Sequence, residues 1–472
     1  MKARLMTGCS HLRTSYWFRP SLMAVVAIVM SFLTTALNFS IGSQWLEDIR
    51  WLYASKLDGA RAVLATQAGS VMTVAGVTFS MTVLSISHTT SQIEPRLLIN
   101  FMGDTRNQFA LAVFFLTFLY CLLVLHTVRH AESAQADAAG NLQQAAALVP
   151  QIAILFAMLF GVTSVGVVIF FVDHIPQSIH ISNVVADVGR ELNSRIEHQF
   201  CSRLRLPHED ASRRDTEARL PESFYHVARK LTGAKSGCNK DLDTDGMIAI
   251  ATDHKLVIRL RCRAADFVTP QTEVLLVAPA ASVDEEITGQ LLATVATGAQ
   301  RTSKQHLRFL VNQLVEVAMR ALSPGVNDPF TAMSCMDWLQ SGLENIANRK
   351  HPDANLHDEN HKLRIITEPE TFVCLVSLNC DRLRPYVAVD RNVPIHMMEM
   401  LAKIAAVTDH SSRRRVLIAC GGRIRKKCLD TVKDKIALKL LTDRYRSSIR
   451  LRRNETYREH LMESGHWIGG RA

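Results

Sequence analysis

Four polar side chains that could act on a ligand stand close together in one short stretch, Ala321–Ala332. They are Ser323, Asn327, Asp328 and Thr331, and Pro324, Gly325 and Pro329 lie between them. A helix that begins at Pro329 would direct its free N–H groups and the positive end of its dipole toward this loop, where an anion could be held. The structural alternative is that the Pro-Gly pair ends one helix and Asp328 caps the next. The second interpretation is favoured, because Asn and Asp before Pro are ordinary helix caps.

A second stretch, residues 351–361, has the composition of a metal site. It contains three histidines and three acidic residues: His351, His357, His361, Asp353, Asp358 and Glu359. In the segment 357–361, an aspartate stands where the zinc-protease pattern places its glutamate. The segment is polar and lacks the periodicity of a helix, which favours a solvated linker over a metal centre. We therefore expect no metal site.

The usual catalytic signatures are absent from the sequence. It contains no Walker loop, no Gly-x-Ser-x-Gly elbow and no Gly-x-Gly-x-x-Gly fingerprint, so ATP hydrolysis, serine hydrolysis and dinucleotide chemistry lack a motif. The ten cysteines form no Cys-x-x-Cys pair, and several lie in apolar runs, which is typical of reduced thiols. We expect a protein that is not an enzyme and carries no cofactor.

The stretch Gln67–Ser91 offers a different chemistry, because it is long enough to cross a membrane yet rich in hydroxyl groups. Between Arg61 and Glu94 the chain contains no Asp, Glu, Lys or Arg. On a helix, small and hydroxylated residues share one face: Gly69, Thr73, Gly76, Ser80 and Ser87. Such a seam either lets another helix approach closely in lipid or faces an ion path, and both interpretations stay open.

Four apolar runs reach spanning length, at 21–41, 68–88, 109–128 and 150–172. None has an ionisable residue near its centre, which argues against a proton-coupled carrier or a voltage sensor. The fourth run carries Ala153, Ala157 and Gly161 at steps of four, a pattern typical of close helix contact. An even number of spans places both termini on one side, and the dense Lys and Arg after the last span indicate the cytoplasm.

The residues after the spans are expected to form a cytoplasmic α+β domain. We divide the chain into a four-span domain (1–180), a helical extension and charged linker (181–235), a small β unit (236–280), a helical domain with the polar loop (281–350), and a polar linker with a basic helical tail (351–472). Strands are predicted at 246–251, 255–262, 267–268 and 273–278, and helices at 283–298, 303–322, 329–347, 395–407 and 428–447.

The net charge of +10 is concentrated after the spans. Basic clusters occur at Arg413–Arg415, Arg423–Lys427 and Arg444–Arg453. Aromatic residues that could stack on bases are scarce among them, so nucleic acid is not expected as a partner. Clusters of this kind suit a cytoplasmic domain beside anionic lipid.

Four pieces of the sequence resemble a family of bacterial predicted membrane proteins that is grouped as a domain of unknown function. They are Gly69–Ser80, Ser91–Leu98, His254–Leu260 and Ala321–Ala332, of which the last is the most specific. The resemblance covers about residues 15–345 and implies an inner-membrane location, four spans and a soluble C-terminal half, with no established activity.

The chain departs from this family in one turn. Where the family has Pro-Gly-Asp-Phe-Val, the chain reads Arg263-Ala-Ala-Asp-Phe-Val268. The turn resembles those of biotinyl and lipoyl modules, but no lysine stands in a Met-Lys-Met-like context. A covalently carried cofactor is therefore not expected.

Together these features predict an α-helical inner-membrane protein with four transmembrane helices, followed by a cytoplasmic α+β domain with a small β unit and a helical portion. Our leading hypothesis is an oligomeric channel or pore-like transport protein gated by its cytoplasmic domain, since four spans rarely enclose a pore alone. The alternative is a membrane-anchored scaffold without transport or catalysis, in which the seam only packs helices and the loop Ser323–Phe330, with the basic tail, meets a cytoplasmic protein partner.

Overall fold

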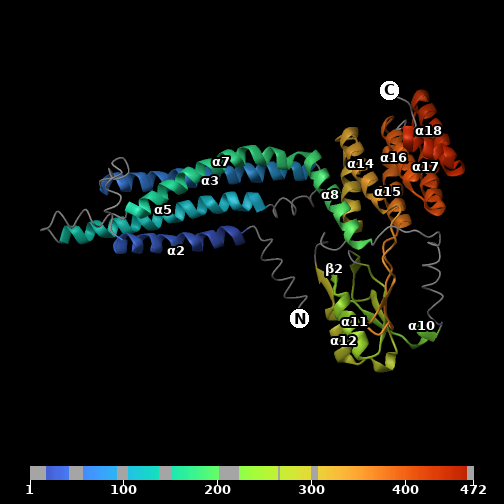
Figure 1. Ribbon diagram of the computed structural model, residues 1–472, viewed down its shortest axis with the longest axis horizontal. Coiled ribbons are helices and arrows are strands. Elements are labelled where there is room, and N and C mark those ends of the chain that lie inside the picture. The colour runs from blue at the N-terminus through green and yellow to red at the C-terminus, as the bar shows by residue number, and fades with distance from the viewer. Residues whose placement is uncertain are drawn as a thin grey trace. The chain divides into compact units, whose positions relative to one another are not determined.

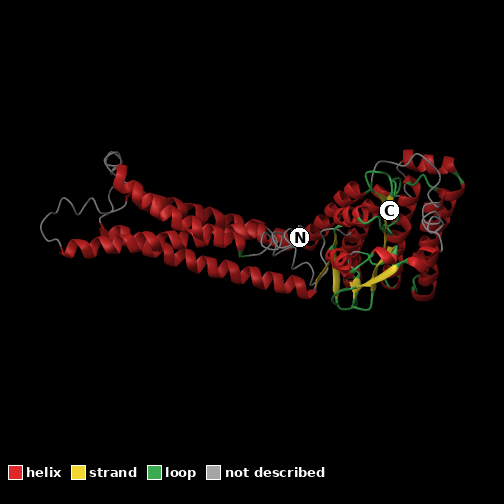
Figure 2. Cartoon of the chain, turned by 90° about the horizontal axis from the view of Figure 1, so that it is seen from below, coloured by secondary structure: helices red, strands yellow, loops and turns green. Residues whose placement is uncertain are grey.

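The computed structural model describes residues 17–41, 57–92, 105–137, 151–200, 223–263, 266–298 and 307–464. The chain divides into two compact units, Leu5–His180 and Ile181–Ala472. Figure 1 follows the chain from one unit to the other by colour. All described strands belong to the second unit, as the yellow segments of Figure 2 show. The expected class, four apolar helices followed by a mixed α and β part, is therefore confirmed.

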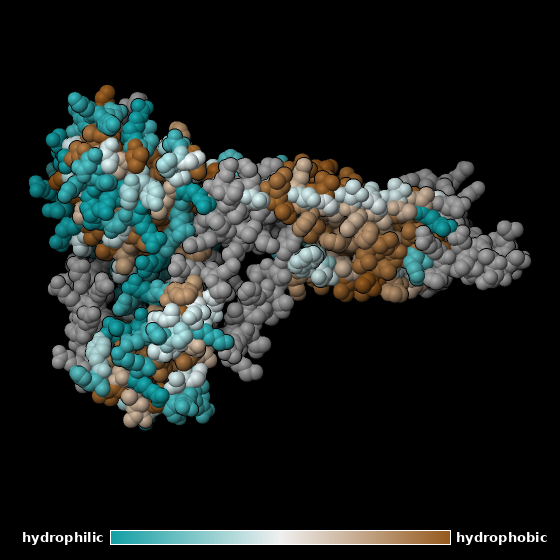
Figure 3. All heavy atoms as spheres, turned by 180° about the vertical axis from the view of Figure 1, so that it is seen from behind, coloured by the Kyte–Doolittle hydropathy of each residue, from teal (hydrophilic) through white to brown (hydrophobic). Residues whose placement is uncertain are grey.

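The first unit consists of four long helices: α2 (Phe18–Ile41), α3 (Leu57–Gln92), α5 (Thr105–Asp137) and α7 (Gln151–Ile179). Each contains a segment long and apolar enough to cross a membrane, at Phe18–Leu37, Gly59–Leu84, Gln108–Val128 and Gln151–His174. The brown surface of this unit in Figure 3 shows the apolar side chains that the helices present outward. The four predicted spans are thus present as helices.

Helix α5 packs against α2, α3 and α7 and carries most of the contacts in this unit. Its Tyr120 is fully buried; the hydroxyl lies 2.9 Å from the Thr34 hydroxyl and donates to the Ala153 carbonyl at 3.1 Å. Ala153 and Ala157 of α7 are also fully buried. A methyl group on Gly161 would overlap the side chain of Gln67, whose amide donates to the Ala157 carbonyl. The predicted ridge of small residues in the fourth span is confirmed.

The second unit contains a five-stranded sheet in the order β1-β5-β3-β8-β7. Its strands are β1 (Arg229–Thr232), β3 (Val257–Leu260), β5 (Glu273–Ala278), β7 (Asn355–His357) and β8 (Leu363–Ile366). Strands β3 and β8 are parallel, with Ile258 opposite Ile365, and the other neighbours are antiparallel. A smaller antiparallel sheet has the order β4-β2-β6, from β2 (Gly237–Leu242), β4 (Phe267–Val268) and β6 (Val295–Gly298).

The strand predicted at 246–251 is wrong, because this run forms helix α11 (Thr244–Asp253). Asp243 caps the helix by accepting from the Gly246 N–H at 2.9 Å. Met247 and Ala251, one turn apart, are fully buried. The helix predicted at 283–298 also divides, into α12 (Glu285–Ala293) and strand β6. Helices α11 and α12 complete the core of this part with Leu256, Ile258, Leu275 and Val277.

The solvated linker predicted at 351–361 is wrong as well. Strands β7 and β8 occupy and follow this segment and form one edge of the larger sheet. The Asp358 carboxylate is buried, accepts from the Arg364 guanidinium at 2.7 Å, and also accepts from the N–H groups of Asn360 and Lys362. These bonds hold the pKa of Asp358 below its usual range. Within the described residues, no group of three or more His, Cys, Asp and Glu side chains could hold a metal ion.

The remaining helices of the second unit pack together beside the sheets. They are α8 (Ile181–Gln199), α10 (Ser223–Val227), the 3-10 turn η3 (Ala280–Ser282), α13 (Leu307–Ala321), α14 (Pro329–Ile346), α15 (Phe372–Val387), α16 (Val393–Val407), α17 (Ser411–Thr431), α18 (Lys435–Arg453) and α19 (Glu455–Ser464). The predicted helix at 428–447 begins in α17 and continues in α18, because Asp434 caps a new helix. The charged linker 202–222 and most of Ser91–Leu98 lie outside the described residues.

Candidate functional site

Helix α3 has two faces of different character. The face that packs inside its unit consists of residues Ala60, Leu64, Ala68, Val71, Ala75, Thr78 and Thr82, which are all buried. The predicted seam, Gly69, Thr73, Gly76, Ser80 and Ser87, lies on nearly the opposite side and is exposed throughout. A methyl group on Gly69 or Gly76 would meet nothing within 4 Å. The seam therefore does not serve packing among the described residues of this unit.

The hydroxyl of Thr73 donates to the Gly69 carbonyl of its own helix at 2.9 Å. Because this bond already gives the hydroxyl a hydrogen-bond partner, Thr73 can face either lipid and protein or water. Thr78 and Thr82 on the buried face also bond to carbonyls of their own helix, at 2.9 and 2.8 Å. The hydroxyls alone do not distinguish a packing seam from a pore lining.

The polar loop at 321–332 joins α13 to α14 by a compact turn. The N–H groups of Val326 and Asn327 donate to the Ser323 carbonyl at 3.1 and 2.9 Å, and Asn327 has a positive φ of 49°. The Ser323 hydroxyl donates to the Arg320 carbonyl at 2.6 Å. Pro324 and Gly325 are exposed. The local bonds thus engage several of the loop's polar groups in ending one helix.

Asp328 caps α14, and Pro329 is in the first turn, as the sequence predicts. One carboxylate oxygen of Asp328 accepts from the Thr331 N–H at 3.1 Å, and the other accepts from the Thr331 hydroxyl at 2.6 Å. The side chain therefore supplies the negative charge that the start of a helix favours. An external anion would have to displace this carboxylate.

We expect Asp328→Ala to lower the free energy of unfolding of the second unit by about 1–2 kcal/mol, because α14 loses its cap. Chemical unfolding of the purified protein, followed by circular dichroism, measures this change. Asp328→Asn, which keeps an acceptor oxygen, should lose less. Equal stability of the Ala variant and the wild type would contradict the capping role.

Helix α14 also packs against α8. One residue, His180, separates α8 from α7, the helix that contains the last span. A methyl group on Gly189 of α8 would overlap the indole of Trp338 of α14. In return, a methyl group on Gly342 of α14 would lie 2.8 Å from the Leu192 side chain of α8. Each helix thus uses one glycine to admit a large side chain of the other, which holds α8 and α14 in close contact.

A line of polar side chains runs beside this contact. Asn193 of α8 donates to the Ser341 hydroxyl at 3.1 Å and accepts from Asn345 at 3.2 Å. Arg349 donates to the Asn345 carbonyl at 3.0 Å and to the Phe200 carbonyl at 3.2 Å, just beyond the end of α8. These bonds fix the register of α8 along α14 at several points.

A polar cleft of about 430 Å³ opens along the same line. Its lining residues are Asn193, Glu197, Ser341, Glu344, Asn345, Asn348, Arg349 and Val407. Burial raises the pKa of Glu344 above its usual range, although Gln340 donates to it at 2.8 Å. The cleft places amides, carboxylates and a guanidinium around one space.

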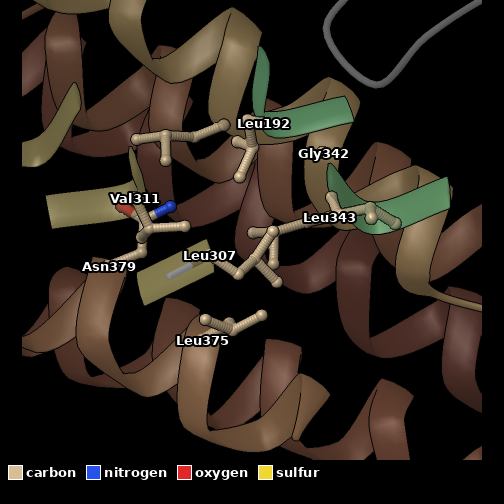
Figure 4. Close-up of a pocket in the computed structure, with 9 residues that line it drawn as sticks. Leu192, Leu307, Val311, Gly342, Leu343, Leu375 and Asn379 are labelled. Atoms are coloured by element: carbon tan, nitrogen blue, oxygen red, sulfur yellow. The ribbon is translucent and has the colours of Figure 1, made fainter. Parts of the chain in front are cut away.

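On the apolar side of α8 lies a small cavity of about 10 Å³ (Figure 4). Leucines of α8, α13, α14 and α15 surround it: Leu192, Leu307, Leu343 and Leu375. Asn379 of α15 also lines it, is fully buried, and has no hydrogen-bond partner for its amide in the described part of the chain. A buried amide without a hydrogen-bond partner lowers the stability of the packing between α8 and its neighbours.

The far end of α14 is held by a buried arginine. Arg413 is 2% exposed and donates to the carbonyls of Ile346, Ala347 and Arg349 at 2.7–3.1 Å, at and just beyond the helix end, where carbonyls lack the partners of a continuing helix. It also lies 3.0 Å from Nε2 of His351. A guanidinium only donates, so Nε2 accepts and the imidazole is neutral. Burial, and then the neighbouring His410, lowers the pKa of His351 from 6.5 to about 4.

This histidine makes stability depend on pH. Between pH 6.5 and 4 the unfolded chain binds a proton at His351 that the folded chain does not, so stability falls as the pH falls through this range. A shift of this size corresponds to about 3 kcal/mol when fully developed. His351→Gln keeps an acceptor without titrating, so chemical unfolding at several pH values should show a flatter profile for this variant. An unchanged profile would contradict the assignment.

The sequence did not indicate Gly189, Asn193, Trp338 or Ser341 as functional residues. The prediction that Arg413 belongs to a basic cluster facing anionic lipid is wrong, because Arg413 is buried and binds carbonyls at the end of α14. One signal for α8 was present: Val185, Val188, Leu192 and Ile196 repeat at helical spacing, and all are buried. A glycine inside such an amphipathic helix marks a close approach. Nothing in the sequence named α14 as the partner.

Residues 13–403 match a family described as "Predicted membrane protein (DUF2254)". Uncharacterized proteins of Mycobacterium bovis and Mycobacterium tuberculosis are each 28% identical to the chain over 362 residues. The aligned region covers 75% of this chain and 65% of each relative, so the chain spans just under two thirds of the length of these curated relatives. None of the solved structures matches the chain.

Proposed function

The chain belongs to the DUF2254 family of predicted membrane proteins, and from this premise we propose that it is an oligomeric, channel-like transport protein of the bacterial inner membrane. Its soluble unit lies in the cytoplasm, as do both termini, and gates the pore. It has no catalytic activity and carries no cofactor.

The exposed seam of α3 carries this proposal. Helices in lipid approach one another through small residues, and the opposite face of α3 already does so within its unit. Lipid gains nothing from a face of glycine, serine and threonine, and such a face is costly compared with leucine or valine. The seam therefore meets another subunit or water. Several copies with α3 innermost would surround a path lined by Thr73, Ser80 and Ser87.

The contact of α8 with α14 supports the gating part of the proposal. Only His180 separates α7 from α8, and α8 is fastened to α14 by two glycine contacts and a line of hydrogen bonds. A movement of α14 is thus passed to α8 and, along the chain, to the last span. The loop at 321–332 stands at the start of the same helix, where a ligand or partner would bias its position.

Ion flux through liposomes that contain the purified protein tests the proposal. We expect selective flux from the full-length protein and none from empty vesicles. The protein truncated after Gln177, which lacks the soluble unit, should conduct without regulation or not at all. Silence of the full-length protein across several ions and pH values would reject the channel.

A second candidate function, a membrane-anchored scaffold, is favoured by two exposed apolar side chains of the polar loop. Val326 is 46% and Phe330 is 78% exposed, which suits binding of a protein partner. Cysteine substitution at 73, 80 and 87 separates the two functions. A water-soluble thiol reagent should label all three positions in a pore, whereas a dry packing seam resists labelling.

A further inference from the structure

One corner of the second unit exposes an unusual number of apolar side chains. The corner is formed by the end of α15, the end of α17 and the start of α18, and we call it the lysine corner. Its apolar residues and their exposed fractions are Val389 (76%), Ile436 (73%), Leu429 (47%), Leu440 (42%) and Tyr386 (36%). Ile436 and Leu440 are one turn apart and so share a face of α18.

These residues are held on one surface by contacts between the three helices. The Thr431 hydroxyl at the end of α17 donates to the Ala388 carbonyl beside Val389 at 2.6 Å. Helices α17 and α18 pack side by side, as Figure 1 also shows, and only three residues connect them. These contacts hold the ends of α15 and α17 and the start of α18 close together, and with them the apolar side chains that they carry.

Five exposed lysines border the patch: Lys426, Lys427, Lys433, Lys435 and Lys439. None of them forms an ion pair among the residues that the structure describes, whereas the nearby Arg423 and Arg444 pair with Asp381 and Glu399. The corner also carries three aspartates, Asp390, Asp430 and Asp434, of which two accept hydrogen bonds from backbone N–H groups. Asp434 accepts from the Ile436 and Ala437 N–H groups, and Asp390 accepts from those of Asn392 and Val393. Because five lysines stand against three aspartates, the corner keeps a net positive charge.

A patch of branched apolar side chains within a border of unpaired lysines matches the boundary between acyl chains and anionic headgroups. The lysine stems can lie along the apolar region while their ammonium groups reach phosphate. We propose that the lysine corner docks on the anionic leaflet of the bilayer that holds the chain's own spans. Nucleic acid fits the corner less well, because Tyr386 is its only aromatic side chain for stacking in the described residues.

Tryptophan fluorescence in lipid nanodiscs tests this docking with the full-length protein. Ile436→Trp places a reporter at the centre of the patch, and wild-type emission is subtracted. In discs that contain brominated phosphatidylglycerol, we expect the added emission to shift to shorter wavelength and to be quenched. Discs of brominated phosphatidylcholine alone should leave it unchanged. Raising the salt concentration should weaken the quenching, because headgroup attraction is screened.

Matched variants on the same helix provide the controls. Arg450→Trp, about 20 Å farther along α18, should not be quenched in either lipid. Lys433→Glu, Lys435→Glu and Lys439→Glu together should reduce quenching of the Ile436→Trp reporter to its level in neutral discs. Arg446→Glu, Arg450→Glu and Arg453→Glu together change the charge equally and should leave quenching intact.

Three results would overturn the proposal. They are absence of quenching at position 436, equal quenching at 436 and 450, and quenching that ignores either the anionic lipid or the lysine reversals. In the first case, the corner would be open to a soluble acidic partner instead. All variants alter exposed side chains, so correct folding is checked by an unchanged circular dichroism spectrum.

Discussion

Replacing Ser80 by Leu should reduce ion flux through vesicles containing the full-length protein by at least tenfold. Ser80 lies in the exposed seam of α3, which it shares with Gly76 and Thr73, although the exposed Val83 and Leu84 stand one turn further along the helix. A leucine there would replace the hydroxyl oxygen, which can substitute for water around an ion in the proposed path, by three carbon atoms. Flux measured with an ion-sensitive dye trapped in the vesicles reports the change directly.

The matched control is Met81→Leu, one residue away at the same depth. Met81 is 63% exposed on another side of α3, so placing the same leucine there, with little change in volume, should leave flux as in the wild type. Loss of flux in both variants would indicate general damage to the span. Normal flux in Ser80→Leu would reject a wet seam and shift support to the scaffold.

Replacing Gly189 by Leu should destabilise the second unit by about 3 kcal/mol. The new side chain would occupy the space of the Trp338 indole, where even a methyl group overlaps the ring. To admit it, α8 must move off α14, which breaks the bonds from Asn193 to Ser341 and Asn345. Chemical unfolding should show the loss, and limited proteolysis should show faster cleavage next to α8.

Gly289→Leu is the corresponding control, because Gly289 lies on the exposed side of α12 with nothing within 4 Å of an added methyl group. Leucine favours helix more than glycine does, so this variant should be as stable as the wild type or slightly more stable. Trp338→Ala in the Gly189→Leu background should recover part of the lost stability. Equal stability of the Gly189→Leu and Gly289→Leu variants would contradict the close contact of α8 with α14.

The spans could be predicted because bilayer thickness sets a length that an apolar run either reaches or does not. The helix beginning at Pro329 could be predicted for a local reason too, since Asp328 and Pro329 define its first turn without help from distant residues. Where a structure depends on a few neighbouring residues, sequence patterns are reliable.

Elsewhere the segment was too short, or its deciding contact too distant in the sequence, for a local pattern to identify the structure. The run 246–251 is only six residues long, so its apolar composition fits strand or helix, and the cap from Asp243 decided for helix. Strand β8 is paired with β3, more than 100 residues earlier. Arg364 of β8 is buried with two partners, the Asp358 carboxylate and the Leu256 carbonyl. A polar segment with such partners resembles a linker until the fold brings them together.

The candidate site shows the same division. The sequence predicts which residues of α3 share the seam face. It does not predict that this face is exposed, because exposure depends on which side of α3 packs against α5 and α7. The contact of Gly189 with Trp338 joins residues about 150 positions apart, which no local pattern could pair.

That separation also sets an order of events during biosynthesis. Helix α8 leaves the ribosome directly after the last span, but α14 follows only after about 150 more residues, which takes roughly 10–30 s at the usual rate of protein synthesis. For this time the apolar side of α8, with Val185, Val188 and Leu192, has no partner from its own chain. Burial of this side of α8 therefore waits for α13 and α14, long after the last span has been synthesised.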